Sequence, residues 1–140
     1  MVASIKPNKE DRKKFDIDLE YGEIKEDQVS SMLQNKKIEV KSERGMWMKT
    51  GNICIEYECW NKPSGINATE SDYWFHNLCI NDKIFCTLVF ETSKLKNIIK
   101  TMKGKKSVMG GDNNASKMWL LPLNKLFELQ TYEEFKDNET

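Results

Sequence analysis

The sequence has little of what zinc-binding and base-reading proteins usually rely on. It holds one histidine, His76, and four cysteines that form no Cys-x-x-Cys pair. Because structural zinc sites need paired ligands at short spacing, no such site is expected. Arg12 and Arg44 are the only arginines among 22 basic residues. Since the guanidinium fork is the usual reader of guanine edges, direct base readout by arginine has weak support.

Long apolar runs and an excess of one charge are also missing. No apolar stretch approaches the roughly 20 residues of a membrane-spanning helix, and residues 1–14 are too charged for a secretory signal. We therefore expect a cytoplasmic protein with no membrane contact and with reduced cysteines. The 22 basic and 22 acidic residues balance, so any attraction to nucleic acid must come from a local basic patch.

The length of 140 residues, 39% of them hydrophobic, suits one compact domain with one core. We predict a single domain over residues 15–132, a flexible arm over 1–14 and an acidic, frayed tail over 133–140. No internal repeat is present.

Local patterns then predict the elements of that domain. Residues 15–21 alternate as an extended segment, Gly22 breaks the pattern, and residues 23–34 have helical spacing. Strands are predicted over 37–43 and 51–59, and the short connection between them favours an antiparallel hairpin. The remaining predictions are a helix capped by Thr69, a buried strand over 83–90, a helix from Thr92 or Ser93, a mobile loop over 104–116 and an edge strand over 118–122.

Charged side chains gather on one face of this hairpin. The strand period of two places Glu39 and Lys41 on the face opposite Ile38 and Val40. The second strand has one apolar face and one that carries Cys54, Glu56 and Glu58. In the expected register Glu39 lies opposite Glu56. Acids so close together repel unless a cation lies among them, so we predict a divalent metal.

Acids and a lysine at one site suit phosphodiester hydrolysis. Carboxylates that hold Mg²⁺ leave water positions open for a nucleophile, and a lysine can stabilise the charge that develops on the phosphate. Glu26 lies on the apolar side of the predicted helix, at a place where an acid needs a reason.

The Glu39-Val40-Lys41 strand, preceded by the helical segment 22–29, resembles the PD-(D/E)XK nuclease superfamily, particularly its Holliday-junction-resolvase-like and phage branches. Segments 49–58, 63–66, 71–74 and 110–112 are similar to those of phage nucleases. The resemblance implies an α/β (α+β) fold with a restriction-endonuclease-like αβββαβ core, in which helices flank a small mixed sheet. It also implies Mg²⁺-dependent cleavage of DNA by an endonuclease, inside the host cell if the chain is phage-encoded. By analogy with resolvases that cut two strands, the resemblance also implies a homodimer.

Chain order leaves two assignments of the motif. In the first, Glu39 and Lys41 are the Glu-x-Lys element and Asp16 or Asp18 is the preceding acid. In the second, which we prefer, Glu39 is the preceding acid, Glu56-Tyr57-Glu58 replaces Glu-x-Lys, and Lys41 supplies the lysine. The predicted catalytic residues are Glu39, Lys41, Glu56 and Glu58. The predicted ligands of the metal, Mg²⁺ or a substituting Mn²⁺, are Glu26, Glu39 and Glu56. The predicted DNA contacts are Lys103, Lys105 and Lys106.

Simpler interpretations remain open. Glu39 and Lys41 can belong to a solvated sheet face, and Glu26 can mark the boundary of an amphipathic helix. His76 can be structural, exposed or a general base. A catalytically inactive nuclease-fold module that binds nucleic acid or a protein is the alternative function.

Overall fold

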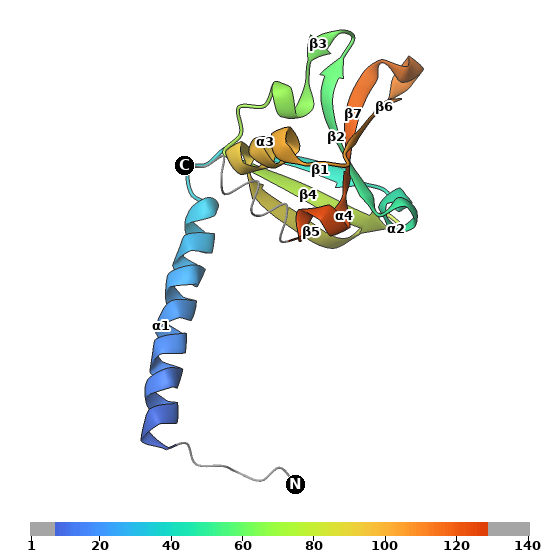
Figure 1. Cartoon of the computed structure of the whole chain (residues 1–140). Coiled ribbons are helices and arrows are strands. Elements are labelled where there is room, and N and C mark those ends of the chain that lie inside the picture. Colours follow the sequence, from blue (N-terminus) through green and yellow to red (C-terminus); the bar gives the residue numbers. More distant parts are fainter. Residues whose placement is uncertain (1–7, 129–140) are drawn as a thin grey trace. The chain divides into compact units, whose positions relative to one another are not determined.

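The structure, a computed structural model, describes residues 8–128, which form a mixed α+β fold (Figure 1). The chain divides into two units, residues 1–36 and 37–140. Within the described residues, the first unit contains helix α1 and the second contains every strand. The longer elements are α1 (Lys9–Met32), β1 (Ile38–Glu43), α2 (Met46–Thr50), β2 (Asn52–Cys59), β4 (Tyr73–Ile80), β5 (Lys83–Glu91), α3 (Thr92–Thr101), β6 (Lys106–Gly110) and β7 (Ser116–Pro122). The short ones are β3 (Lys62–Pro63), the 3-10 turns η1 (Gly65–Asn67) and η2 (Asp112–Asn114), and α4 (Leu123–Leu126).

Helix α1 corrects the predicted extended segment over 15–21 and the predicted break at Gly22, because it runs through both. A strand needs a partner to satisfy its backbone groups, and no strand pairs with this segment, whereas a helix satisfies them internally. The helix begins within the predicted arm, and the predicted tail over 133–140 lies outside the described residues. In the part of the chain that is described, no helix has the length and apolar character needed to cross a membrane.

The strands of the second unit form two sheets. Sheet A has the order β1-β4-β5, with β1 parallel to β4 and β4 antiparallel to β5. Sheet B is antiparallel and has the order β3-β2-β7-β6. The strands predicted over 37–43, 51–59 and 83–90 and the helix predicted from residue 92 are confirmed. The predicted burial of the strand over 83–90 is wrong, because β5 lies at the edge of sheet A and has no buried residue.

The predicted hairpin between β1 and β2 is wrong, because these strands lie in different sheets. The connection between them holds α2, and its Trp47 contacts sheet A. The Trp47 indole donates to the Cys79 carbonyl oxygen at 2.9 Å and stacks on Phe85. Glu39 therefore pairs with Trp74 of β4 rather than with a residue of β2.

Three further predictions are corrected. The predicted helix from Thr69 is instead strand β4, which is central in sheet A and buried on both faces at its middle, so its apolar residues do not alternate. The predicted mobile loop contains β6, paired with β7. Strand β7 is confirmed as a strand but lies inside sheet B. Pro122 is tolerated there because the β6 ladder ends at Leu120, so its missing N–H breaks no bond on that side.

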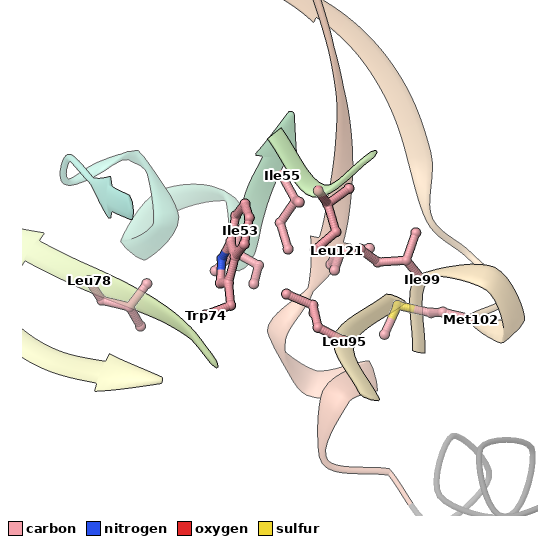
Figure 2. Close-up of a cluster of buried hydrophobic side chains, with 9 residues drawn as sticks. Ile53, Ile55, Trp74, Leu78, Leu95, Ile99, Met102 and Leu121 are labelled. Carbon is pink, nitrogen blue, oxygen red and sulfur yellow. The ribbon is translucent and has the colours of Figure 1, made fainter. Parts of the chain in front are cut away.

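The hydrophobic core joins the two sheets to α3. Ile53 and Ile55, on the apolar face predicted for β2, are buried, and they pack with Leu121 of β7 (Figure 2). The remaining core residues come from η1, β4, α3 and the residue that follows α3: Ile66, Trp74, Leu78, Leu95, Ile99 and Met102. The amphipathic α3 supplies its apolar stripe to this cluster.

Strand β1 has the opposite orientation from an ordinary sheet strand. Its predicted alternation is correct, but its apolar side chains face outward: Val40 is 56% exposed. The Glu43 side chain, on the other face, is only 11% exposed. At Glu43 the charged face of β1 is thus directed toward the interior of the unit, where a carboxylate must find donors, whereas Lys41 on the same face stays exposed.

Substitution of Trp60 tests a strained turn. Trp60 and Asn61 join β2 to β3 with φ of 51° and 61°, a left-handed conformation that costs a non-glycine residue about 1–2 kcal/mol. The Trp60→Gly variant should have an unfolding free energy about 1 kcal/mol higher than that of Trp60→Ala, because glycine adopts the left-handed conformation without strain. The greater entropy of glycine in the unfolded state offsets part of this gain. Urea denaturation of both variants measures this. Equal stability would contradict the assignment of strain to Trp60.

Candidate functional site

A cavity of about 350 Å³ lies in the second unit, next to the charged face of β1. We call it the Glu43 pocket. It is lined by Lys41, Ser42, Glu43, Arg44, Cys54, Glu56, Trp74, His76 and Met118. Strands of both sheets contribute to it, and its charged side chains are two acids and two bases. Such a mixture suits an anionic group, a cation, or both together.

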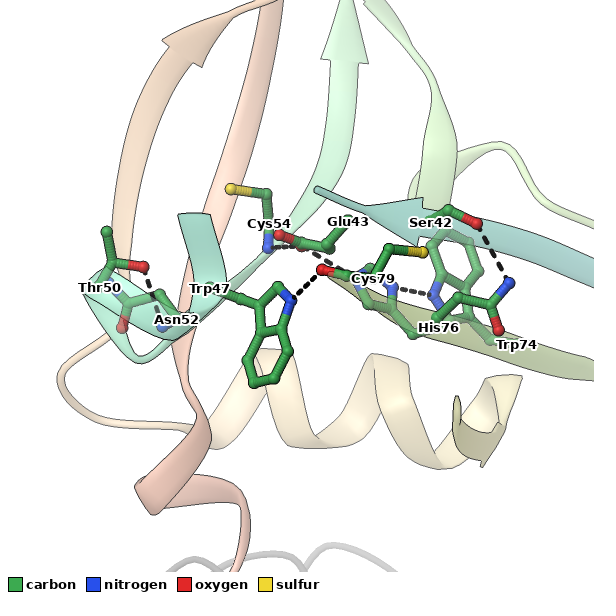
Figure 3. Close-up of polar contacts among 10 residues, drawn as sticks. Ser42, Glu43, Trp47, Thr50, Asn52, Cys54, Trp74, His76 and Cys79 are labelled. Carbon is green, nitrogen blue, oxygen red and sulfur yellow. Dashed lines mark hydrogen bonds and ion pairs between the residues drawn. The ribbon is translucent and has the colours of Figure 1, made fainter. Parts of the chain in front are cut away.

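Two hydrogen bonds hold the Glu43 side chain in the pocket. Its Oε1 accepts a hydrogen bond from the backbone N–H of Cys54 and one, at 2.9 Å, from Nε2 of His76 (Figure 3). The Cys54 N–H needs this acceptor because β3 pairs only with Glu58 and Cys59 and does not reach Cys54. A side chain thus completes the edge of β2 where a strand is missing.

His76 lies under Glu43 and is 1% exposed. Its Nδ1 accepts a hydrogen bond of 3.1 Å from the indole Nε1–H of Trp74, two residues earlier on the same face of β4 (Figure 3). Trp74, His76 and Glu43 therefore form one chain of hydrogen bonds that ends at the pocket. The sequence left open whether His76 is exposed, and the structure shows that it is buried within this chain of hydrogen bonds.

Lys41 lies beside Glu43 on the same face of β1. Its Nζ is 2.9 Å from Oε1 of Glu39 and 6.0 Å from the centre of the Trp74 ring. Glu39 also lines a second, shallower pocket with residues of η1 and the loop that follows it. Of the predicted pair, Lys41 reaches the Glu43 pocket, and Glu39 contacts that lysine.

A β-bulge separates the two acids of β2. Glu56 pairs with Met118 and Glu58 pairs with Lys117. Because Met118 and Lys117 are consecutive on β7, they face opposite sides of sheet B, and so do the two glutamates. Glu56 lines the Glu43 pocket, whereas Glu58 lies 2.8 Å from Lys117 and its hydrogen bond raises the pKa of that lysine. The predicted shared face of Glu56 and Glu58 is wrong.

The other predicted residues lie elsewhere. Glu26 is exposed on α1, in the first unit, and its metal role stays a prediction. Asp16 and Asp18 are helical, so neither is the strand acid that the first motif assignment requires. Lys105 donates to the Met102 carbonyl and lies over the Trp119 ring. The flanking Lys103 and Lys106 are exposed.

Sequence reasoning missed Glu43 and Arg44. The signal for Glu43 was available, because residues 39, 41 and 43 share one strand face by the same alternation that selected Glu39 and Lys41. The interaction that distinguishes Glu43 comes from His76, which is 33 residues away in sequence. No local pattern encodes that contact.

The thiol of Cys54 faces this charged environment. Burial, and then the neighbouring Glu43 carboxylate, raise its pKa to about 11. At neutral pH the thiol is therefore protonated and is neither a nucleophile nor a good metal ligand. Across the described residues, no group of three or more His, Cys, Asp or Glu side chains could hold a metal ion.

Comparison of the chain with protein-family models, with curated proteins and with solved structures gave no match.

Gly65 of η1 controls the position of Glu56. Its φ is +50°, and a Cβ at this residue would collide with the Glu56 carbonyl oxygen. Gly65→Ala should therefore destabilise the fold by about 3 kcal/mol. The matched control is Gly104→Ala, which has a φ of +86° but no atom near the added Cβ and should cost about 1 kcal/mol. Urea unfolding of both variants measures the difference, and equal losses would contradict the close contact at Glu56.

Alkylation tests the environment of Cys54. With a pKa of about 11 rather than 9.0, its thiolate fraction at pH 8 falls about 100-fold, and iodoacetamide labelling should slow accordingly. Glu43→Gln should accelerate labelling of Cys54, because it removes a negative charge beside the thiol, whereas Glu39→Gln should not. Mass spectrometry of the Cys54 peptide follows the rate. Labelling at the rate of an unfolded control peptide would contradict this account.

Proposed function

We propose that the protein is a divalent-metal-dependent nuclease that hydrolyses DNA phosphodiester bonds. The observation that carries the proposal is the convergence of Lys41, Glu43 and Glu56 on one pocket from two strands of different sheets. Glu43 replaces Glu39 as the first strand acid of the motif, and Glu56 keeps the role expected from the sequence. Lys41 keeps the role of the lysine.

The donor set of the pocket fits Mg²⁺. This ion is commonly held by one or two carboxylates, with waters and substrate phosphate oxygens completing its shell, so a protein cage of three ligands is not required. Glu43 can use one of its oxygens to bind the ion. Both of its hydrogen bonds are accepted by Oε1, and Oε2 accepts neither. When bound, the ion would lower the pKa of a coordinated water and polarise the phosphoryl group.

The cationic side chains of the pocket can neutralise the charge of the substrate phosphate. Lys41 lines the pocket and keeps its ammonium group near Trp74 and Glu39, which hold it in place. Arg44 is exposed at the pocket wall, where its guanidinium suits a phosphate of the DNA backbone. These groups stabilise the negative charge of the substrate, which the two glutamates would otherwise repel.

The restriction-endonuclease-like core belongs to the same proposal. The chain order α1, β1, β2, the mixed sheet A and the packing of α3 support it. The division of β1 and β2 between two sheets is a departure from the expected hairpin. We propose that this core acts on DNA inside the cell, with Lys103, Lys105 and Lys106 as backbone contacts.

The test is cleavage of closed-circular plasmid, branched duplex and single-stranded DNA with Mg²⁺ or Mn²⁺, followed by EDTA. We expect metal-dependent nicking of the plasmid, which has no ends and therefore reports endonuclease activity. Glu43→Gln and Glu56→Gln should each lower the rate about 100-fold or more. The matched control is Glu58→Gln, on the same strand but the opposite face, which should keep the rate within a few-fold.

Failure to cleave any of these DNAs with either metal would contradict the proposal. The alternative, an inactive nuclease-fold module, is favoured by one observation: Lys41 and Arg44 both line the pocket, and cations of this kind can bind a phosphate without a metal. DNA binding that persists in EDTA and in Glu56→Gln, without cleavage, would support that module.

A further inference from the structure

His76 is a buried polar residue that lies between the hydrophobic core and the charged Glu43 pocket. It is the chain's single histidine, and its neighbour Trp74 belongs to the hydrophobic core. Burying an imidazole and an indole N–H requires partners for both, and an apolar pair of similar volume avoids that cost. The two rings lie nearly parallel, with centres 6.5 Å apart. What the polar pair adds is a hydrogen bond to Glu43.

The partners of His76 fix its tautomer. An indole nitrogen can only donate, so Nδ1 of His76, which receives the Trp74 bond, must carry no hydrogen. In the neutral ring the hydrogen then lies on Nε2, which donates it to Oε1 of Glu43. Neither nitrogen is left with an available lone pair. His76 is therefore neither a general base nor a metal ligand in this arrangement.

The donors on Glu43 are neutral, and this preserves its charge for a ligand. A lysine or arginine at the position of His76 would pair with the carboxylate and compete with a cation. The nearby Lys41 instead contacts Glu39 at 2.9 Å. The Cys54 amide and the imidazole both hold Oε1, which restricts rotation of the carboxylate without cancelling its charge.

We propose that Trp74 and His76 are positioning residues that orient the Glu43 carboxylate so that Oε2 is presented to a divalent cation. The inference rests on the proposed function and extends it. Histidine–carboxylate pairs at metal sites usually place the histidine on the metal. In the proposed site the carboxylate of Glu43 contacts the ion, and the histidine donates a hydrogen bond to that carboxylate. Loss of such supporting partners typically weakens metal binding about 10- to 100-fold.

The first measurement concerns the protein without metal. Long-range ¹H–¹⁵N NMR distinguishes histidine tautomers, and the single histidine makes the spectrum unambiguous. We expect an unprotonated Nδ1 and a protonated Nε2. Trp74→Phe removes the donor to Nδ1 but keeps an aromatic ring beside Lys41, and it should release His76 from this fixed tautomer. A wild-type spectrum with hydrogen on Nδ1 would overturn the proposal.

The second measurement is Mn²⁺ affinity by calorimetry. Trp74→Phe and His76→Leu should weaken binding about 10-fold or more, whereas His76→Gln, whose amide can donate to Glu43, should recover most of the affinity. Thr87→Val is the matched control, because it removes the hydrogen bond from Thr87 to Asn77 in the same sheet and has no described contact with Glu43. Urea unfolding verifies that each variant is folded at the temperature used.

The outcomes separate the two proposals. Wild-type Mn²⁺ binding with unchanged affinity in Trp74→Phe and His76→Leu would overturn the positioning role and leave the proposed function intact. No Mn²⁺ binding by the wild type would contradict the proposed function, and the positioning role toward a cation would fall with it.

Discussion

One carboxylate joins the two sheets of this protein. Glu43 belongs to β1 of sheet A, and its Oε1 takes a backbone N–H from β2 of sheet B and an imidazole N–H from β4. A buried acid with two neutral donors is stable only while both are present, since loss of either leaves an unpaired group in a partly buried place. The position of the pocket, the orientation of β1 and the closure of the β2 edge all depend on this group.

The sequence predicted local structure better than pairing. The strands around Ile38 and Ile53, the strand that starts at Lys83 and the helix that contains Leu95 all follow from short-range alternation or helical spacing. Strand partners do not, because they are chosen by contacts between distant residues. Trp47, in the connection between β1 and β2, is bonded to Cys79 of β4, and no pattern near either strand indicates this contact.

The candidate site was predictable only where it depends on local strand alternation. Lys41 and Glu56 were selected from strand faces, and both line the pocket. Glu58 was selected by the same alternation, which fails at the bulge, where β2 has one residue more than β7. Glu43 stood on the predicted face, but only the buried His76 distinguishes it from a surface acid.

The parallel pairing of β1 with β4 has a consequence for folding. Parallel neighbours require a long crossover connection, and here that connection contains β2, which belongs to the other sheet. Sheet B in turn needs β7, near the end of the described chain, to pair with β2. Contacts of such high sequence separation form late and slowly, because loop-closure entropy must be overcome first. During synthesis the pocket therefore cannot be assembled until β7 has left the ribosome, so a nascent chain has no completed site.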